Sequence, residues 1–110
     1  MAYDEALAAR VRDLISAQAD LSEKKMFGSN CFLIGGNLAV CVRQDELLVR
    51  LDPEDAERAL AEDGVRIAEM GSRVMKGWIF VSSEKLEGDQ ELAEWVDAGA
   101  DFAASLPAKS

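Results

Sequence analysis

The sequence predicts an α+β protein in which helices pack on one side of a five-stranded antiparallel sheet. Two observations support this. Apolar residues recur at every second position in short segments, which is the spacing of strands. Other segments repeat apolar residues every three or four positions, which is the spacing of amphipathic helices. Along the chain these segments give the order αβββαββα, and helices gathered on one face of the sheet give a two-layer sandwich.

The first helix is expected from about Asp4 to Gln18. One side of it is apolar and the other is charged, so the apolar side should pack on the sheet. The apolar positions are Leu7, Val11, Leu14 and Ile15.

Three strands are expected between Lys25 and Leu51. Gly35-Gly36-Asn37 supplies residue types that accept positive φ for one turn, and Gln44-Asp45 supplies a polar tip for the next. A two-residue turn at Gln44-Asp45 places Val42 opposite Leu47, Val40 opposite Val49 and Leu38 opposite Leu51. The register of the preceding hairpin stays open, because the glycine turn can hold two or three residues.

The second half of the chain predicts a short helix, two strands and a long helix. Asp52 followed by Pro53 is typical of a helix start, and Gly64 is typical of a residue that ends one. Strands follow at about 65–70 and 75–82, and the second has large apolar residues on both faces. The last helix, about 89–105, has the clearest helical period, with an acidic outer face that we interpret as a solvent-exposed surface.

Length and composition predict one cytoplasmic domain over residues 1–110. The chain is 49% hydrophobic and 30% charged, no apolar run is long enough to span a membrane, and the acidic first residues do not resemble a signal sequence. The formal net charge of −9 repels a phosphate backbone, so no direct contact with nucleic acid is expected.

Cys31 and Cys41 lie on neighbouring predicted strands. The favoured interpretation is two buried or half-buried thiols in a reducing compartment. A cross-strand disulfide or redox switch needs the register that sets the two cysteines opposite each other, which the three-residue form of the glycine turn would provide. The chain has no histidine, and two thiols alone do not favour a zinc site, although carboxylates could complete one.

The absence of histidine also removes the common nucleophile and general-base pairs of small hydrolases. The glycine-flanked segment 71–77 contains Lys76, but its spacing is not that of a phosphate-binding loop, and a strand rather than a helix follows it. No enzyme activity, cofactor or metal is therefore predicted.

Five cations lie on or beside the predicted sheet in an otherwise acidic protein. If they converge, they would form a site for an anion or carboxylate. The alternative, which we favour, is that they are separate solvated side chains that pair with nearby Glu23, Asp52 and Glu69. The cations are Lys24, Lys25, Arg50, Arg73 and Lys76.

Four motifs, in this order and spacing, resemble the N-terminal domain of the TfoX/Sxy family. They are Lys24-Lys25-Met26-Phe27-Gly28, the glycine turn before Asn37-Leu38-Ala39-Val40, the strand Leu47-Leu48-Val49-Arg50, and Arg73-Val74-Met75-Lys76-Gly77-Trp78. The chain departs from the usual Phe-Gly-Gly of the family by having Ser29 after Gly28, which bears on any role that needs the second glycine's backbone freedom.

The resemblance implies a bacterial protein with a secretion-chaperone-like α+β architecture. Full-length members regulate natural competence together with the cAMP receptor protein and carry a second, C-terminal domain, which is not expected in a chain that ends at Ser110. Stand-alone copies of the domain mostly lack an assigned activity.

The function expected on these grounds is that of a non-enzymatic interaction module. It would dock on a protein partner such as a transcription regulator through the sheet edge or the surroundings of Met26, Phe27 and Trp78, although core packing is the competing role for Phe27 and Trp78. The alternative is a small-molecule anion-binding protein or an unrecognised enzyme that uses a Lys/Arg cluster. A monomer and a homodimer are both compatible with the pattern. The candidate site residues are Lys25, Met26, Phe27, Gly28, Arg50, Arg73, Lys76 and Trp78.

Overall fold

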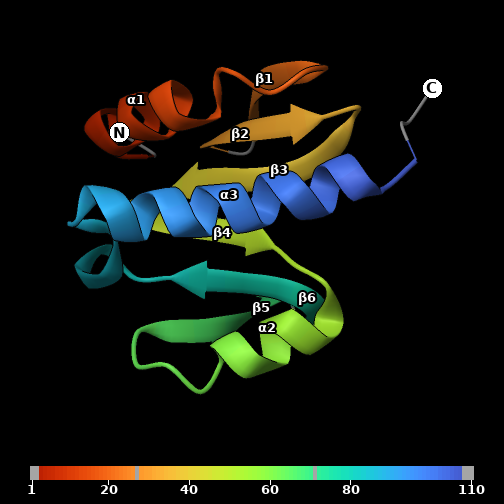
Figure 1. The fold of residues 1–110 in the computed structure, drawn as a ribbon. Helices are drawn as coiled ribbons and strands as arrows, with labels where there is room; N and C mark the ends of the chain where they lie inside the picture. Colours follow the sequence, from red (N-terminus) through yellow and green to blue (C-terminus); the bar gives the residue numbers. More distant parts are fainter. Residues whose placement is uncertain (1–2, 27, 71, 108–110) are drawn as a thin grey trace.

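A computed structural model describes residues 3–26, 28–70 and 72–107 and confirms an α+β fold with one antiparallel sheet and three α-helices (Figure 1). The helices are α1 (Glu5–Ile15), α2 (Pro53–Ala59), the short 3-10 helix η1 (Ser83–Leu86) and α3 (Asp89–Ser105). The strands are β1 (Leu21–Met26), β2 (Ser29–Ile34), β3 (Asn37–Arg43), β4 (Glu46–Arg50), β5 (Val65–Met70) and β6 (Arg73–Val81).

The sheet has six strands where the sequence predicted five, and the additional one is β1. It pairs with β2 from Leu21 opposite Ile34 to Met26 opposite Ser29. Residues 22–25 of this strand are exposed, because β1 forms one edge of the sheet. An exposed edge strand has no need for alternating apolar residues, so the rule that finds half-buried strands does not detect it.

The strands lie in the order β1-β2-β3-β4-β6-β5, which puts β3 and β4 in the middle and α3 across them (Figure 1). One face of the sheet packs against the helices and forms the main core. The largest fully buried side chains in this core come from both layers. They are Phe32, Val40, Val42, Leu47, Val49, Ile79 and Val81 from the sheet, and Val11, Ile15, Leu92 and Val96 from α1 and α3.

The β3–β4 register is confirmed for Val42 opposite Leu47 and Val40 opposite Val49. The expected pairing of Leu38 with Leu51 is wrong. The reason is a β-bulge in β3, where the register with β2 moves from Phe32 opposite Val40 to Leu33 opposite Leu38 and leaves Ala39 unpaired. An inserted residue turns the following side chains to the other face of a strand. Leu38 therefore packs with the cysteines, whereas Leu51 stays in the main core.

Helix α3 approaches the bulge closely at Gly99. A Cβ atom at this position would lie 2.6 Å from the carbonyl oxygen of Ala39 and 2.8 Å from Cγ1 of Val40. Only a residue without a side chain lets the helix lie this close to the backbone of β3. The bulge and the glycine together fix the height of α3 above the sheet.

The opposite face of the sheet carries a second, smaller apolar cluster. Cys31, Leu33 and Cys41 are buried there, with Leu38 and Leu48 packed against them. Farther along the same face, the guanidinium groups of Arg43 and Arg66 lie 5.8 Å and 4.8 Å from the centre of the Phe80 ring. We call this side, with Cys31, Cys41 and Phe80, the outer face.

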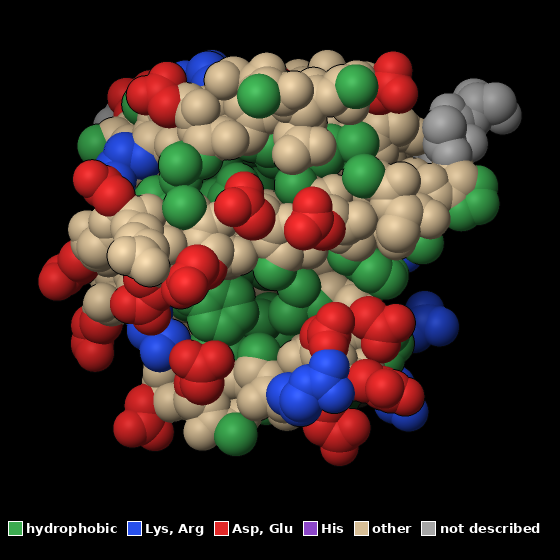
Figure 2. Space-filling view, viewed as in Figure 1, with side chains coloured by type: hydrophobic (Ala, Val, Ile, Leu, Met, Phe, Trp, Pro, Cys, Tyr) green, Lys and Arg blue, Asp and Glu red, His purple; other side chains and the backbone are tan. Residues whose placement is uncertain are grey.

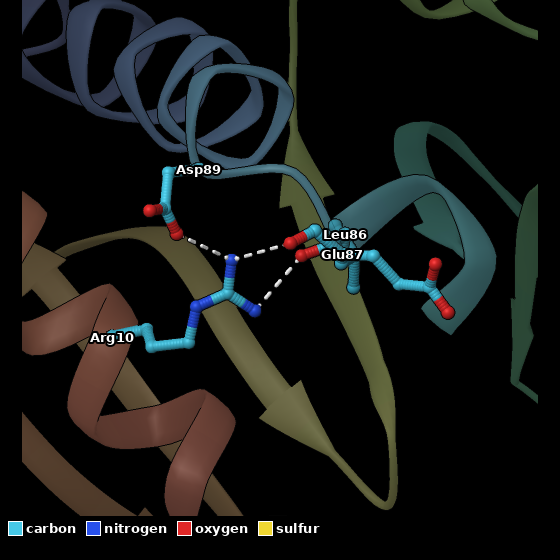
Figure 3. Close-up of polar contacts among 4 residues, drawn as sticks. All are labelled: Arg10, Leu86, Glu87 and Asp89. Carbon is cyan, nitrogen blue, oxygen red and sulfur yellow. Dashed lines mark hydrogen bonds and ion pairs between the residues drawn. The ribbon is translucent and has the colours of Figure 1, made fainter.

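Arg10 joins α1 to the start of α3 (Figure 3). Its guanidinium donates hydrogen bonds to the carbonyl oxygens of Leu86, at 2.9 Å, and Glu87, at 3.2 Å, and it pairs with the Asp89 carboxylate at 3.0 Å. These two carbonyl groups lie at the C-terminal end of η1, where backbone acceptors have no partner within the helix. Arg10 thereby ties the first helix to the segment from which α3 departs.

Helix α2 begins as predicted, because the side chain of Asp52 accepts a hydrogen bond from the backbone N–H of Glu54 at 3.0 Å and Pro53 opens the first turn. It ends at Ala59, earlier than the expected stop at Gly64. The helix is short and its buried residues are only Ala56 and Ala59. A helix with such a narrow apolar side covers little of the neighbouring surface.

Candidate functional site

An open groove lies between α2 and α3 on the helical side of the molecule. It encloses about 540 Å³ and adjoins a second hollow of about 580 Å³, and the two share Glu62, Trp95 and Ala98. Figure 2 shows hydrophobic side chains on the floor of this hollow and acidic side chains around it. We call it the α2–α3 groove. Its first part is lined by Leu51, Asp52, Asp55, Arg58, Ala59, Glu62, Trp95, Ala98, Asp101 and Phe102.

The groove exists because the two facing helices differ in the size of their side chains. Helix α2 presents Ala59, and α3 presents Trp95, Ala98 and Phe102 at three- and four-residue spacing. Alanine side chains are too short to cover the two aromatic rings. Trp95 and Phe102 are consequently only half-buried, although the Trp95 side chain also packs against the main core.

The rim of the groove is strongly acidic. Six carboxylates and one guanidinium, that of Arg58, line its two parts. Arg58 pairs with Asp55, while Lys85 lies 3.1 Å from Glu62 and 3.4 Å from Glu91. These carboxylates raise the pKa of Lys85, and Glu62 has the largest effect. A negative field concentrated over exposed aromatic rings favours a ligand that is both cationic and apolar.

Two of the residues predicted from the sequence, Arg50 and Trp78, lie together on neighbouring strands, and Arg50 also reaches Phe102 of the groove. The Arg50 guanidinium lies 5.0 Å from the centre of the Trp78 ring and 5.6 Å from that of Phe102, which also lines the groove. Both distances are within the range of cation–π attraction. The pairing of Arg50 with Trp78 across β4 and β6 sets this contact.

The two predicted lysines of β1 are separated from Arg50 in the sheet. Lys24 and Lys25 are exposed on β1, and β2 and β3 separate that edge strand from β4. Arg73 and Lys76 are exposed on β6, near its hairpin with β5. The sheet thus places the lysines of β1 and the cations of β6 on opposite sides of its two central strands.

The remaining predicted site residues surround the β1–β2 turn. Gly28 is exposed and has a φ of 73°, which suits glycine in a tight turn. Met26 ends β1, and Phe27 lies outside the described residues. None of the contacts that define the α2–α3 groove involves this turn.

Sequence reasoning did not identify the groove. The acidic face of the last helix was interpreted as a solvent-exposed surface. The available signal was the combination of two large aromatic residues on α3 with a facing helix whose apolar positions are alanines. That combination indicates an incomplete cover, but only the fold shows that the two helices face each other.

Within the described ranges, no group of three or more cysteine, aspartate or glutamate side chains is arranged to hold a metal ion. Among these same residues, no helix combines the length and the apolar character that a membrane crossing requires.

Comparison with known proteins identifies one family and one similar fold. The family model described as the TfoX N-terminal domain matches residues 13–103. The crystal structure of Deinococcus radiodurans protein DR2400, with the family-model domain DUF419, superposes with a TM-score of 0.68 at 16% sequence identity and covers 84% of this chain and 74% of that one. A search of curated proteins gave no match.

Proposed function

The chain belongs to the TfoX N-terminal domain family, and from this membership we propose that it is an interaction module that binds a basic, partly apolar segment of a protein partner in the α2–α3 groove. TfoX N-terminal domains are not a known family of enzymes. The observation that carries the proposal is the pair of half-buried aromatic rings, Trp95 and Phe102, inside an acidic rim.

The chemistry of the groove defines the segment that would fit it. Aromatic residues at the centre of an interface commonly supply most of its binding energy, and the polar rim keeps water out. An amphipathic helix could place leucine or phenylalanine on Trp95 and Phe102 while its lysines and arginines meet the carboxylates. The partner would therefore be basic, which suits a chain whose own net charge is −9.

We further propose that the partner is a transcription regulator and that binding takes place in the cytoplasm, with residues 1–110 acting as one domain. The resemblance to the TfoX/Sxy family supports the choice of partner. The acidic balance supports a protein rather than a nucleic acid as the bound molecule. The secretion-chaperone-like architecture that the resemblance implies stays a prediction.

Titration of fluorescein-labelled helical peptides tests the groove. One peptide carries lysines and leucines on opposite sides, and its matched control carries glutamates in place of the lysines. Fluorescence anisotropy should detect binding of the basic peptide alone, and Trp95→Ala should weaken it by at least tenfold, or about 1.4 kcal/mol. Val74→Ala is the control, because Val74 is 51% exposed and lies outside the groove.

Trp95 also contacts the core, so each variant is checked by circular dichroism and urea unfolding. The charge-reversal pair Glu94→Lys and Asp101→Lys changes the rim without removing apolar contacts, and it should weaken binding of the basic peptide. Equal binding of both peptides, or binding insensitive to Trp95 and to the rim charges, would contradict the proposal. A photo-crosslinker at position 94 in cells then identifies the partner, which must contribute a basic segment.

A second candidate function is the binding of a small anion by Arg50. This guanidinium lies against two rings and has no ion-pair partner among the described residues. Thermal-shift screening with phosphate, nucleotides and carboxylates tests it, since a ligand at about a hundred times its Kd stabilises a protein by roughly 2.7 kcal/mol. A shift that Arg50→Gln abolishes would support this function, and the absence of any shift would oppose it.

A further inference from the structure

The two cysteines of the chain meet on the outer face of the sheet. Cys31 of β2 lies directly opposite Cys41 of β3, and their Sγ atoms are 2.8 Å apart. Both are free thiols. A disulfide bond requires the sulfurs to approach to roughly 2.0 Å, with Cα atoms within about 7 Å, and directly paired residues of neighbouring strands meet the second condition.

The bulge in β3 produces this meeting. The glycine turn holds two residues, Gly35 and Gly36, because Ile34 pairs with Asn37 and Leu33 with Leu38. Continued without interruption, that register would set Cys31 opposite Val40. The unpaired Ala39 shifts it by one residue and brings Cys41 opposite Cys31. The bulge therefore produces the pairing for which the sequence pattern predicts a three-residue turn.

The surroundings of the pair restrict what can reach it. Cys31 is 5% exposed and Cys41 is 4% exposed, beneath the side chains of Leu38 and Leu48. This cluster is separate from the main core under the helices. At these exposures a small peroxide needs less displacement of the covering side chains than a large thiol reagent does.

The two thiols are not equivalent. The hydrogen bond with Cys41 lowers the pKa of Cys31 against the opposing effect of burial. The same contact and burial raise the pKa of Cys41, against weaker effects of Ser29 and Arg43. Because the thiolate is the nucleophile, this difference in pKa favours Cys31 as the first residue to react.

We propose that Cys31 and Cys41 form a redox site, which a small peroxide converts into a cross-strand disulfide and which a dithiol reductant restores. The redox site lies on the outer face of the sheet and does not involve the α2–α3 groove.

The reaction has two steps. The Cys31 thiolate attacks one oxygen of the peroxide, the O–O bond breaks, hydroxide leaves, and Cys31 becomes a sulfenic acid. The Cys41 sulfur then attacks the Cys31 sulfur, the S–O bond breaks, and water leaves with the Cys41 proton. In total, hydrogen peroxide and two thiols give two waters and one disulfide. Thiol–disulfide exchange with a dithiol reverses the change and oxidises that dithiol.

Mass spectrometry of the intact, reduced protein after exposure to hydrogen peroxide tests the proposal. We expect the protein to lose the mass of two hydrogens while it stays monomeric, and peptide mapping without reductant should link position 31 to position 41. Dithiothreitol in native buffer should restore both thiols. Addition of oxygen without a link, a link between two chains, thiols that stay reduced, or a disulfide that resists dithiothreitol would each overturn the proposal.

Two matched variants test the order of events. In Cys41→Ser, the sulfenic acid of Cys31 has no partner and should accumulate, to be trapped by a 1,3-diketone probe. In Cys31→Ser, no intramolecular disulfide can form, and peptide mapping should find position 41 without a link. Circular dichroism confirms that each variant is folded. The absence of a trapped sulfenic acid in Cys41→Ser would contradict the assigned order of events.

The wild-type protein provides a test that needs no variant. In a dithiothreitol redox buffer, the equilibrium constant for disulfide formation should be at least tenfold larger in the folded protein than in urea, because the fold already holds the two sulfurs together. A constant that is equal or smaller in the folded protein would show that the strand geometry opposes the bond.

Discussion

At the scale of single residues, Glu46 reaches over β6 to hold Arg66 of β5 on the outer face. Arg66 donates two hydrogen bonds to its carboxylate, one of them at 2.8 Å, and also lies against Phe80. The hydrogen bonds from Arg66 lower the pKa of Glu46 from its ordinary value of 4.5, against the effect of burial. The ion pair therefore contributes stability above that pH, and this contribution is lost as pH falls and Glu46 becomes protonated.

We expect Glu46→Gln to lower the free energy of unfolding at pH 7 by about 0.5–1 kcal/mol, a modest value because the Arg66 side chain is 57% exposed. The difference from wild type should shrink below pH 4.5 and vanish once Glu46 is protonated in both the folded and unfolded states. Urea unfolding at a series of pH values measures it.

Glu57→Gln serves as the control, because Glu57 is exposed on α2 and has no ion-pair partner in the described part of the chain. It should show no comparable dependence on pH. A Glu46→Gln effect that stays constant from pH 7 to below 4 would mean that the ionised carboxylate is not what stabilises the fold.

Residue types alone predicted that both cysteines are buried or half-buried thiols, and both are buried free thiols. Their direct opposition could not be predicted, because a one-residue bulge at Ala39 leaves no compositional mark and shifts every later pair. The contact of Arg50 with Phe102 has a similar origin. It joins residues far apart in sequence through a packing that no local pattern encodes.

At the scale of secondary-structure elements, the contact between α3 and β3 depends on Gly99. Replacing glycine by alanine within a helix normally stabilises it by about 1 kcal/mol. Here the added Cβ would lie 2.6 Å from the carbonyl oxygen of Ala39, which is backbone and cannot rotate away. Overpacking of this kind costs roughly 1–3 kcal/mol, so the steric effect should exceed the gain in helix propensity.

We therefore expect Gly99→Ala to lower the free energy of unfolding by about 1–2 kcal/mol, as measured by urea denaturation. Gly88→Ala, at the N-cap of the same helix, is the control, because nothing lies within 4 Å of a Cβ at that position. Its cost should be about 1 kcal/mol at most. A Gly99→Ala protein as stable as wild type would show that α3 can rise from the bulge without loss.

The elements differ in how well the sequence predicted them. The last helix was expected at 89–105 and is found at Asp89–Ser105, because a long apolar period is the strongest local signal. The start of α2 at Asp52 and Pro53 was equally clear. Strand β1 was missed because four of its six residues are polar and exposed, and the early end of α2 was missed because alanine-rich turns carry no stop signal before Gly64.

At the scale of the whole molecule, the net charge of −9 should affect stability and binding in opposite directions. Added sodium chloride screens repulsion among the carboxylates and should raise the free energy of unfolding of the free protein. The same screening should weaken binding of the basic peptide in the α2–α3 groove, by at least several-fold between low and physiological salt. Urea unfolding and anisotropy titrations across one salt series measure both effects.

The double variant Glu94→Gln and Asp101→Asn is the control for the groove, because it removes two charges from the rim. Its peptide affinity should depend less on salt than that of wild type. If the wild-type affinity does not change with salt, apolar contact alone holds the peptide, and the charge argument for a basic partner is wrong.

The exposed strand β1 has a consequence for behaviour at high concentration. Its outer edge offers free backbone hydrogen-bonding groups, which in many proteins start aggregation by pairing with another chain. A second copy that docked antiparallel, centred on the middle of Lys24-Lys25, would bring lysines directly opposite lysines, which is unfavourable. Strand β1 was not predicted because its residues are polar. The same polar residues disfavour the pairing of a further strand at that edge of the sheet.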